Sequence, residues 1–173
     1  MKLTEPLDRR RMIGVAGAAM PFAVVSTESH GRQPERFTGK QILNIPKDNA
    51  MLASSIASYE KFGYSPAVRA GGLLFIAGQI GRRPDGGIGS VAEQAELALK
   101  RTAEILHLAG LTMADLVEVV SYHVDIETNL KEFMAVKARY TVKPFPAWSI
   151  IGVQALASPG LKIEIRSIAV FPD

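Results

Sequence analysis

The chain has 173 residues, of which 47% are hydrophobic and 21% are charged, and its formal net charge is +3. This length suits one domain with a single core and is too short for two ordinary domains. The charged fraction is near the globular average, which excludes disordered and fibrous classes. Acidic residues alternate with basic ones through the body and leave no basic stripe, so we expect no nucleic-acid partner. Because cysteine is absent, the chain has no disulfide, thiolate nucleophile or cysteine-bound metal.

Residues 1–30 differ in composition from the rest and resemble an export leader. Three arginines, Arg9 to Arg11, precede an apolar run of 14 residues (12–25), and a polar stretch follows. This order is typical of a secretory signal, and paired arginines before a weakly hydrophobic run are typical of a twin-arginine signal. The run is too short for a stable membrane span, and Pro21 interrupts it. We expect a periplasmic or secreted protein, or a cytoplasmic one if this segment is only an uncleaved amphiphilic tail.

Residues 31–50 are expected to form a polar spacer, and residues 51–173 the folded domain. A short strand or helical turn is predicted near 51–59. Two strands, 64–70 and 73–79, should form a hairpin at Gly71 and Gly72. After a loop at 82–89, Ser90 and Glu93 have the spacing of a capping box, which predicts a helix that ends at Gly110.

The second half predicts a strand at 117–124, after a helical turn, and a second helix capped by Asn129 and Glu132 that reaches about Val142. Two final strands follow, joined by a Pro/Gly turn. In the last one, a set of alternate residues should face the core: Ile163, Ile165, Ser167 and Ala169. This order of elements predicts an α+β layer with both helices on one face of a sheet.

Two separated stretches, 64–80 and 145–170, resemble the RidA/YjgF family of small trimeric proteins, once called L-PSP endoribonucleases and now known chiefly as enamine/imine deaminases. The resemblance implies a chorismate-mutase-like mixed β-sheet with two helices on one face. It also implies a homotrimer with ligand clefts between subunits, and neither a cofactor nor a metal.

The resemblance assigns roles to three residues. Glu164 matches the glutamate associated with the water that attacks the imine carbon, and Tyr64 matches a cleft tyrosine. Gly78 matches a glycine whose backbone faces the ligand. The residues alone favour a solvated strand carboxylate paired with Lys162 or Arg166, and only the resemblance makes the catalytic role of Glu164 a comparable alternative. Tyr64 could cap a strand, and Gly78 could mark a bulge.

The main departure from the family is Trp148. The family has Pro-Ala-Arg-Ser, whose arginine binds the substrate carboxylate, whereas this chain has tryptophan at the third position. A neutral indole cannot replace a bidentate guanidinium. Trp148 could stack an aromatic or hydrophobic ligand, or it could fill a degenerate pocket. We hypothesise that Arg166 partly restores the missing cation from a different wall of the cleft.

Two functions follow as hypotheses. The first is an exported, cofactor-free hydrolase or deaminase that acts on a small imine, enamine or related metabolite with altered specificity. The second is a non-catalytic trimer that binds a small molecule in its clefts. An endoribonuclease or translation inhibitor is a weaker alternative. Whether the protein is an enzyme stays open at this point.

Overall fold

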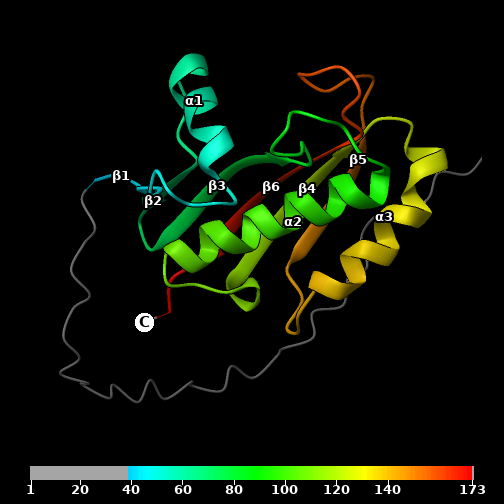
Figure 1. Ribbon diagram of the computed structural model, residues 1–173. Helices are drawn as coiled ribbons and strands as arrows, with labels where there is room; N and C mark the ends of the chain where they lie inside the picture. Colours follow the sequence, from blue (N-terminus) through cyan, green and yellow to red (C-terminus); the bar gives the residue numbers. More distant parts are fainter. Residues whose placement is uncertain (1–38, 173) are drawn as a thin grey trace, which may run out of the picture. The chain divides into compact units, whose positions relative to one another are not determined.

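A six-stranded sheet is the centre of the fold, which the computed structural model describes over residues 39–172, apart from the side chains of residues 53 and 54 (Figure 1). The strand order is β1-β2-β3-β6-β4-β5; β4 and β5 are parallel, and the other neighbours are antiparallel. The sheet is therefore mixed, as predicted. The strands are β1 (Gln41–Ile42), β2 (Ala67–Ala70), β3 (Leu73–Ile80), β4 (Leu116–His123), β5 (Ala147–Gly152) and β6 (Ile163–Val170).

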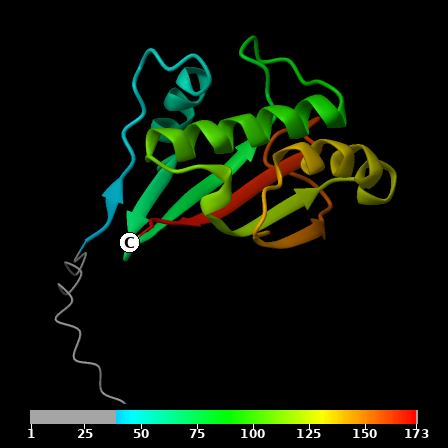
Figure 2. The same cartoon turned by 90° about the horizontal axis from the view of Figure 1, so that it is seen from below.

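Two long helices, α2 (Val91–Leu108) and α3 (Ile126–Tyr140), lie side by side on one face of this sheet (Figure 2). Helix α2 packs over β3 and β6, and α3 lies over β4. This arrangement confirms the predicted layer. A shorter helix, α1 (Ala53–Phe62), forms where the sequence predicted either a short strand or a helical turn. A 3-10 turn at Met113–Asp115 precedes β4.

The core lies between the sheet and the two long helices. The predicted inward face of β6 is confirmed, because Ile163, Ile165, Ser167 and Ala169 are all buried. Burying each isoleucine side chain contributes about 1.5–3 kcal/mol to the stability of the fold. From the helices, Leu99 and Ile105 of α2 and Phe133 of α3 complete this core.

The hairpin between β2 and β3 forms where the two glycines predict it. Gly71 and Gly72 have φ angles of 56° and 80°, in the left-handed region that glycine adopts without steric cost. Ala70 pairs with Leu73 across this turn, and the pairing continues to Ala67 and Ile76. The hairpin therefore fixes the register of β3 at its first half only.

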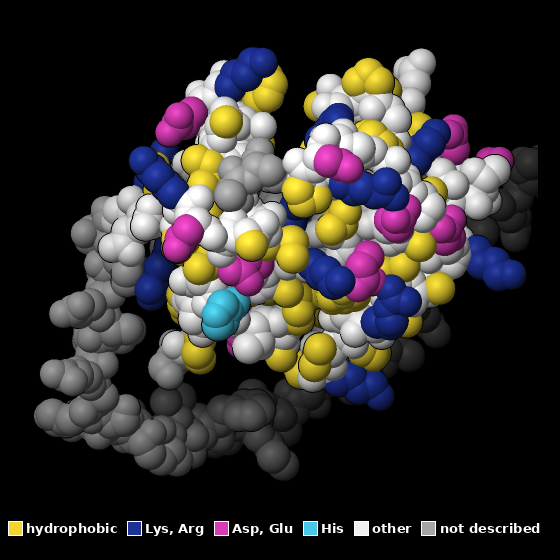
Figure 3. All heavy atoms as spheres, in the orientation of Figure 1, with side chains coloured by type: hydrophobic (Ala, Val, Ile, Leu, Met, Phe, Trp, Pro, Cys, Tyr) yellow, Lys and Arg dark blue, Asp and Glu magenta, His cyan; other side chains and the backbone are white. Residues whose placement is uncertain are grey.

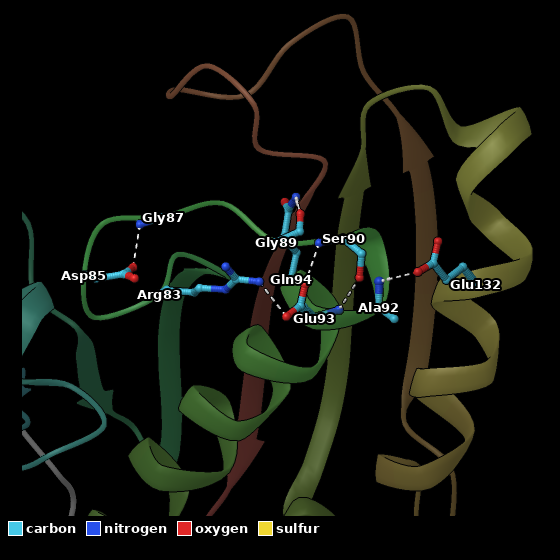
Figure 4. Close-up of polar contacts among 9 residues, drawn as sticks. All are labelled: Arg83, Asp85, Gly87, Gly89, Ser90, Ala92, Glu93, Gln94 and Glu132. Carbon is cyan, nitrogen blue, oxygen red and sulfur yellow. Dashed lines mark hydrogen bonds and ion pairs between the residues drawn. The ribbon is translucent and has the colours of Figure 1, made fainter.

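The predicted capping box at the start of α2 is also confirmed. Ser90 Oγ accepts a hydrogen bond from the Glu93 backbone N–H, and Glu93 accepts one from the Ser90 N–H at 2.8 Å (Figure 4). The other Glu93 carboxylate oxygen accepts a hydrogen bond from Arg83 at 2.6 Å. Glu93 thus ties the loop 81–89 to the first turn of α2.

The predicted cap of the second helix was wrong. Helix α3 begins at Ile126, after Asp125 in a left-handed conformation with φ 53°. The Asn129 side chain instead donates to the Val124 carbonyl at 3.0 Å, and Glu132 accepts from the Ala92 N–H of α2. The Asn-x-x-Glu spacing was misleading because Asn129 bonds back to the residue before the Asp125 cap and Glu132 contacts another helix. Helix α3 ends at Tyr140 rather than near residue 142.

The predicted spacer contributes to the fold. Strand β1 lies within residues 31–50 and pairs with β2, and Leu43 and Ile45 pack against the core. The leader, residues 1–30, lies outside the described residues. Within the described part, no helix has both the length and the apolar character that a membrane crossing requires.

Candidate functional site

A cavity of about 640 Å³ lies beside β3, between α1 and the loops 81–89 and 153–162. It exists because β2 pairs with β3 only as far as Ile76, so that residues 78–80 lack a strand partner on that side within the described chain. Figure 3 shows the surface hollowed between α1, at upper left, and the loops at upper right. The cavity brings together three of the five predicted site residues: Tyr64, Gly78 and Glu164.

Glu164 reaches the cavity because it faces away from the core of β6. Its neighbours Ile163 and Ile165 are fully buried on the helix side, whereas Glu164 is half-buried on the other side. Among residues 39–172, no group donates a hydrogen bond to its carboxylate, and Lys162 pairs with Asp125 instead. Burial raises the pKa of Glu164 above its ordinary value. An unpaired carboxyl with a raised pKa is suited to accept and return a proton.

Gly78 makes room for this carboxylate. A Cβ atom at residue 78 would lie 2.0 Å from Oε1 of Glu164, so any other residue would displace the carboxyl. The pairing of β3 with β6 shifts register between Ile76 and Gln79, which places Gly78 in a β-bulge. The sequence left open whether Gly78 marks a bulge or faces a ligand. The bulge is present, Gly78 also lines the cavity, and its ligand-facing role stays a prediction.

Tyr64 also lines the cavity, and it follows directly after α1. Gly63 ends α1 in a left-handed conformation, and the Tyr64 N–H donates to the Tyr59 carbonyl at 3.1 Å. The two tyrosine rings meet edge to face at 5.1 Å. Burial raises the pKa of Tyr64, and the nearby Glu164 charge raises it further. The phenol therefore stays protonated near neutral pH and can donate a hydrogen bond in the cavity.

Trp148 is not among the residues that line this cavity. It pairs with Val119 of β4 and faces the helix side of the sheet, where its ring meets Phe133 of α3 at 6.3 Å. Its Nε1–H donates to Ser121 Oγ at 3.0 Å, and the Lys137 ammonium lies 4.3 Å from the ring centroid. Within the single chain, Trp148 serves as a packing residue under α3.

Arg166 shares the sheet face of Glu164, as the alternation of β6 predicts, but the structure does not bring it to the cavity. Its guanidinium lies 3.5 Å from the Glu118 carboxylate on the neighbouring strand. The cation missing at residue 148 therefore does not come from Arg166 within this cavity.

Three arginines that the sequence reasoning missed do line the cavity: Arg82, Arg83 and Arg101. Arg101 had a detectable signal, because it follows Ala98 by three residues and so lies on the buried stripe of α2, where a charged residue is unusual. Arg82 and Arg83 lie in a loop and carry no such signal. Within residues 39–172, no group of three potential metal ligands converges.

Comparisons with known proteins show which family the chain belongs to. The family model described as endoribonuclease L-PSP matches residues 55–171. The chain belongs to this family, which is the RidA/YjgF family. The RutC family protein YjgH of Escherichia coli is 38% identical over 117 residues, which cover 66% of this chain and 88% of that protein. The human 2-iminobutanoate/2-iminopropanoate deaminase is 36% identical over 110 residues, covering 62% of this chain and 79% of the relative.

Solved structures of the RidA/YjgF family have the same fold. A structure of protein YjgH covers 66% of this chain and 88% of its own, with a TM-score of 0.61 and 38% identity. A structure of RidA from the Antarctic bacterium Psychrobacter covers 62% of this chain and 88% of its own, with a TM-score of 0.58 and 28% identity. The mixed sheet and its helices are therefore those of the family.

The opposite environments of two carboxylates predict opposite pH effects on stability. Because the pKa of Glu164 is raised on folding, its ionisation opposes folding as the pH rises. We expect Glu164→Gln to unfold at higher urea concentration than the wild type at pH 7.5, and this gain in stability to vanish near pH 4.

Glu93 should behave in the opposite way. Hydrogen bonds from the Ser90 backbone and from Arg83 lower the pKa of Glu93, so Glu93→Gln should be less stable than the wild type at pH 7.5, and this loss should shrink in acid. The same sign for both variants would contradict this assignment.

The packing of Trp148 predicts the effect of restoring an arginine. Trp148→Arg removes the ring contact with Phe133 and brings a second cation near Lys137, so we expect a loss of at least about 1 kcal/mol in the free energy of unfolding. Trp148→Phe keeps an aromatic ring in the same place and should lose less. Urea denaturation measures both, and an arginine variant as stable as the wild type would show that residue 148 is not packed under α3.

Proposed function

We propose that the protein is a cofactor-free hydrolase that converts a small imine or enamine into a carbonyl compound and ammonia. The observation that carries this proposal is the Glu164 carboxyl, which is unpaired within the described residues, partly withdrawn from water and open to a cavity of substrate size. The name of the human relative supports the reaction class, since that protein is a 2-iminobutanoate/2-iminopropanoate deaminase.

The mechanism needs one proton-transfer group and one water molecule. The Glu164 carboxylate takes a proton from the water while the water oxygen forms a bond to the imine carbon. Because the bound imine is taken as protonated on nitrogen, this addition gives a neutral carbinolamine, whose amino group then receives the proton from Glu164. The carbon–nitrogen bond breaks, ammonia leaves, and the carbinolamine hydroxyl gives its proton to the Glu164 carboxylate as the carbonyl forms. Glu164 then releases this proton, which entered with the iminium, to water, and an enamine follows the same route after it tautomerises to its imine. A pKa raised toward neutrality suits a group that acts first as a base and then as an acid.

Two neighbours can position the substrate. The Gly78 bulge lies directly beside the Glu164 carboxyl, and Tyr64 offers a protonated hydroxyl in the same cavity. Oriented donors of this kind stabilise charge that develops during the reaction. We further propose an altered specificity, because the residue at position 148 is a packed indole rather than a carboxylate-binding arginine. The non-catalytic alternative took its support from Trp148, which packs under α3 within the chain and does not line this cavity.

We also propose that the protein forms a homotrimer. The sheet face opposite α2 and α3 exposes apolar side chains, among them Phe75, Ile151 and Val170, and no helix of the described residues covers it (Figure 2). An apolar face of this kind is a typical subunit interface. A monomeric mass in analytical ultracentrifugation at micromolar concentration would contradict this proposal.

The direct test of the hydrolase proposal is ammonia release from 2-iminopropanoate generated in situ by oxidation of alanine. We expect the wild type to accelerate release, and Glu164→Gln to be slower by about 100-fold or more, because the amide cannot transfer the proton. Glu132→Gln is the matched control, since Glu132 is an exposed carboxylate on α3 that contacts α2, away from the cavity. Equal rates for wild type and Glu164→Gln would contradict the role of Glu164.

Export through the leader remains a proposal, supported by the arginines at 9–11 and the apolar run that follows. When the full chain is expressed in a bacterium with a twin-arginine system, we expect it in the periplasmic fraction. Replacement of Arg9, Arg10 and Arg11 together by lysine should retain it in the cytoplasm. An unchanged distribution between the two fractions would show that the leader does not act as a twin-arginine signal.

A further inference from the structure

Arg101 is an unusual residue for the buried stripe of a helix. Its exposed fraction is 3%, and its neighbours on the stripe of α2 are Ala98, Thr102 and Ile105. Arg101 also lines the cavity that contains Glu164. Removing a guanidinium from water costs several kcal/mol unless a counter-charge or a full set of acceptors compensates it.

The contacts of Arg101 compensate its charge only in part. One terminal nitrogen donates to the Ile80 carbonyl at 2.5 Å, and the other donates to the Arg82 carbonyl at 2.7 Å. A guanidinium has five N–H groups, and these two bonds use two of them. The Nε–H has no acceptor among the described residues, and none of their carboxylates forms an ion pair with Arg101.

The walls of the cavity are positively charged overall. Its described lining includes three arginines but only one carboxylate, Glu164. Arg83 is paired with Glu93 outside the cavity, and Arg82 donates to the Gly86 carbonyl at 2.8 Å. Arg101 therefore holds the one buried cationic charge of the lining whose counter-charge the described chain does not supply.

We propose that Arg101 binds the anionic group of the ligand in this cavity. The proposal deepens the hydrolase proposal, because it concerns the same cavity and names a binding residue for it. The second N–H of each terminal nitrogen remains for a carboxylate, while the bonds to Ile80 and Arg82 hold the guanidinium in place. Such preorganisation lowers the entropic cost of binding. The cation comes from α2, rather than from residue 148 or residue 166.

Binding can be measured without turnover by comparing two probes of nearly equal size. 2-Oxobutanoate carries a carboxylate, and 2-oxobutanamide is its neutral amide. We expect the wild type to bind the carboxylate at least tenfold more tightly than the amide in isothermal titration. Equal affinities, or no binding of either probe at millimolar concentration, would overturn the proposal.

Variants then assign the preference to Arg101. Arg101→Gln should weaken carboxylate binding at least tenfold and leave amide binding nearly unchanged, and Arg101→Lys should recover part of the loss. Arg139→Gln is the matched control, because it removes the same charge from an exposed arginine that pairs with Glu96 on the helix surface. A folded Arg101→Gln variant with wild-type carboxylate affinity would show that Arg101 only supports the end of β3.

The wild type offers a readout that does not depend on the variants folding. The side-chain ¹⁵N resonances of Arg101 should shift on titration with 2-oxobutanoate and stay in place with 2-oxobutanamide. No shift with the carboxylate at saturating probe would overturn the proposal. Absence of ammonia release together with these shifts would contradict the hydrolase proposal and leave the role of Arg101 standing.

Discussion

The close approach of Gly78 and the Glu164 carboxyl is the constraint on which the site depends. The carboxyl occupies the space that a Cβ of residue 78 would fill, and the bulge in β3 leaves that residue out of the regular ladder. Because the carboxyl lies there without a described donor, its ionisation is disfavoured. The ionised Glu164 carboxylate therefore destabilises the fold, and it lies where the unpaired end of β3 lines the cavity.

The surrounding elements hold the cavity open rather than neutralise Glu164. Helix α1 and Tyr64 form one wall, and the loop 81–89 forms another, held to α2 by Arg83 and Glu93. Arg101 connects α2 to the end of β3 through two carbonyls. Arg82 and Arg83 are occupied by Gly86 and Glu93, which leaves Glu164, the Tyr64 hydroxyl and the remaining donors of Arg101 for a ligand.

The parts of the fold that the sequence predicted depend on local signals. The glycine pair predicts the hairpin, the Ser90–Glu93 spacing predicts α2, and alternation predicts the buried face of β6. Resemblance to the family placed Glu164, Tyr64 and Gly78 in one site, and the structure brings these residues together.

Other features could not be predicted from the sequence. The start of α3 was missed because Asp125 adopts a left-handed conformation that no local sequence pattern indicates. The position of Trp148 could not be predicted either, because the side it faces depends on the parallel pairing of β5 with β4, and the role of Arg101 depends on a loop carbonyl far from it in the sequence.

The most direct test of this account is the pKa of Glu164 itself, followed through its side-chain carboxyl ¹³C resonance during a pH titration of the ligand-free protein. We predict a Glu164 midpoint above the ordinary range of a glutamate and a Glu93 midpoint below that range in the same experiment. A Glu164 midpoint at or below the ordinary value would show that the carboxyl is solvated or paired. That result would contradict its assignment as the proton-transfer group of the cavity.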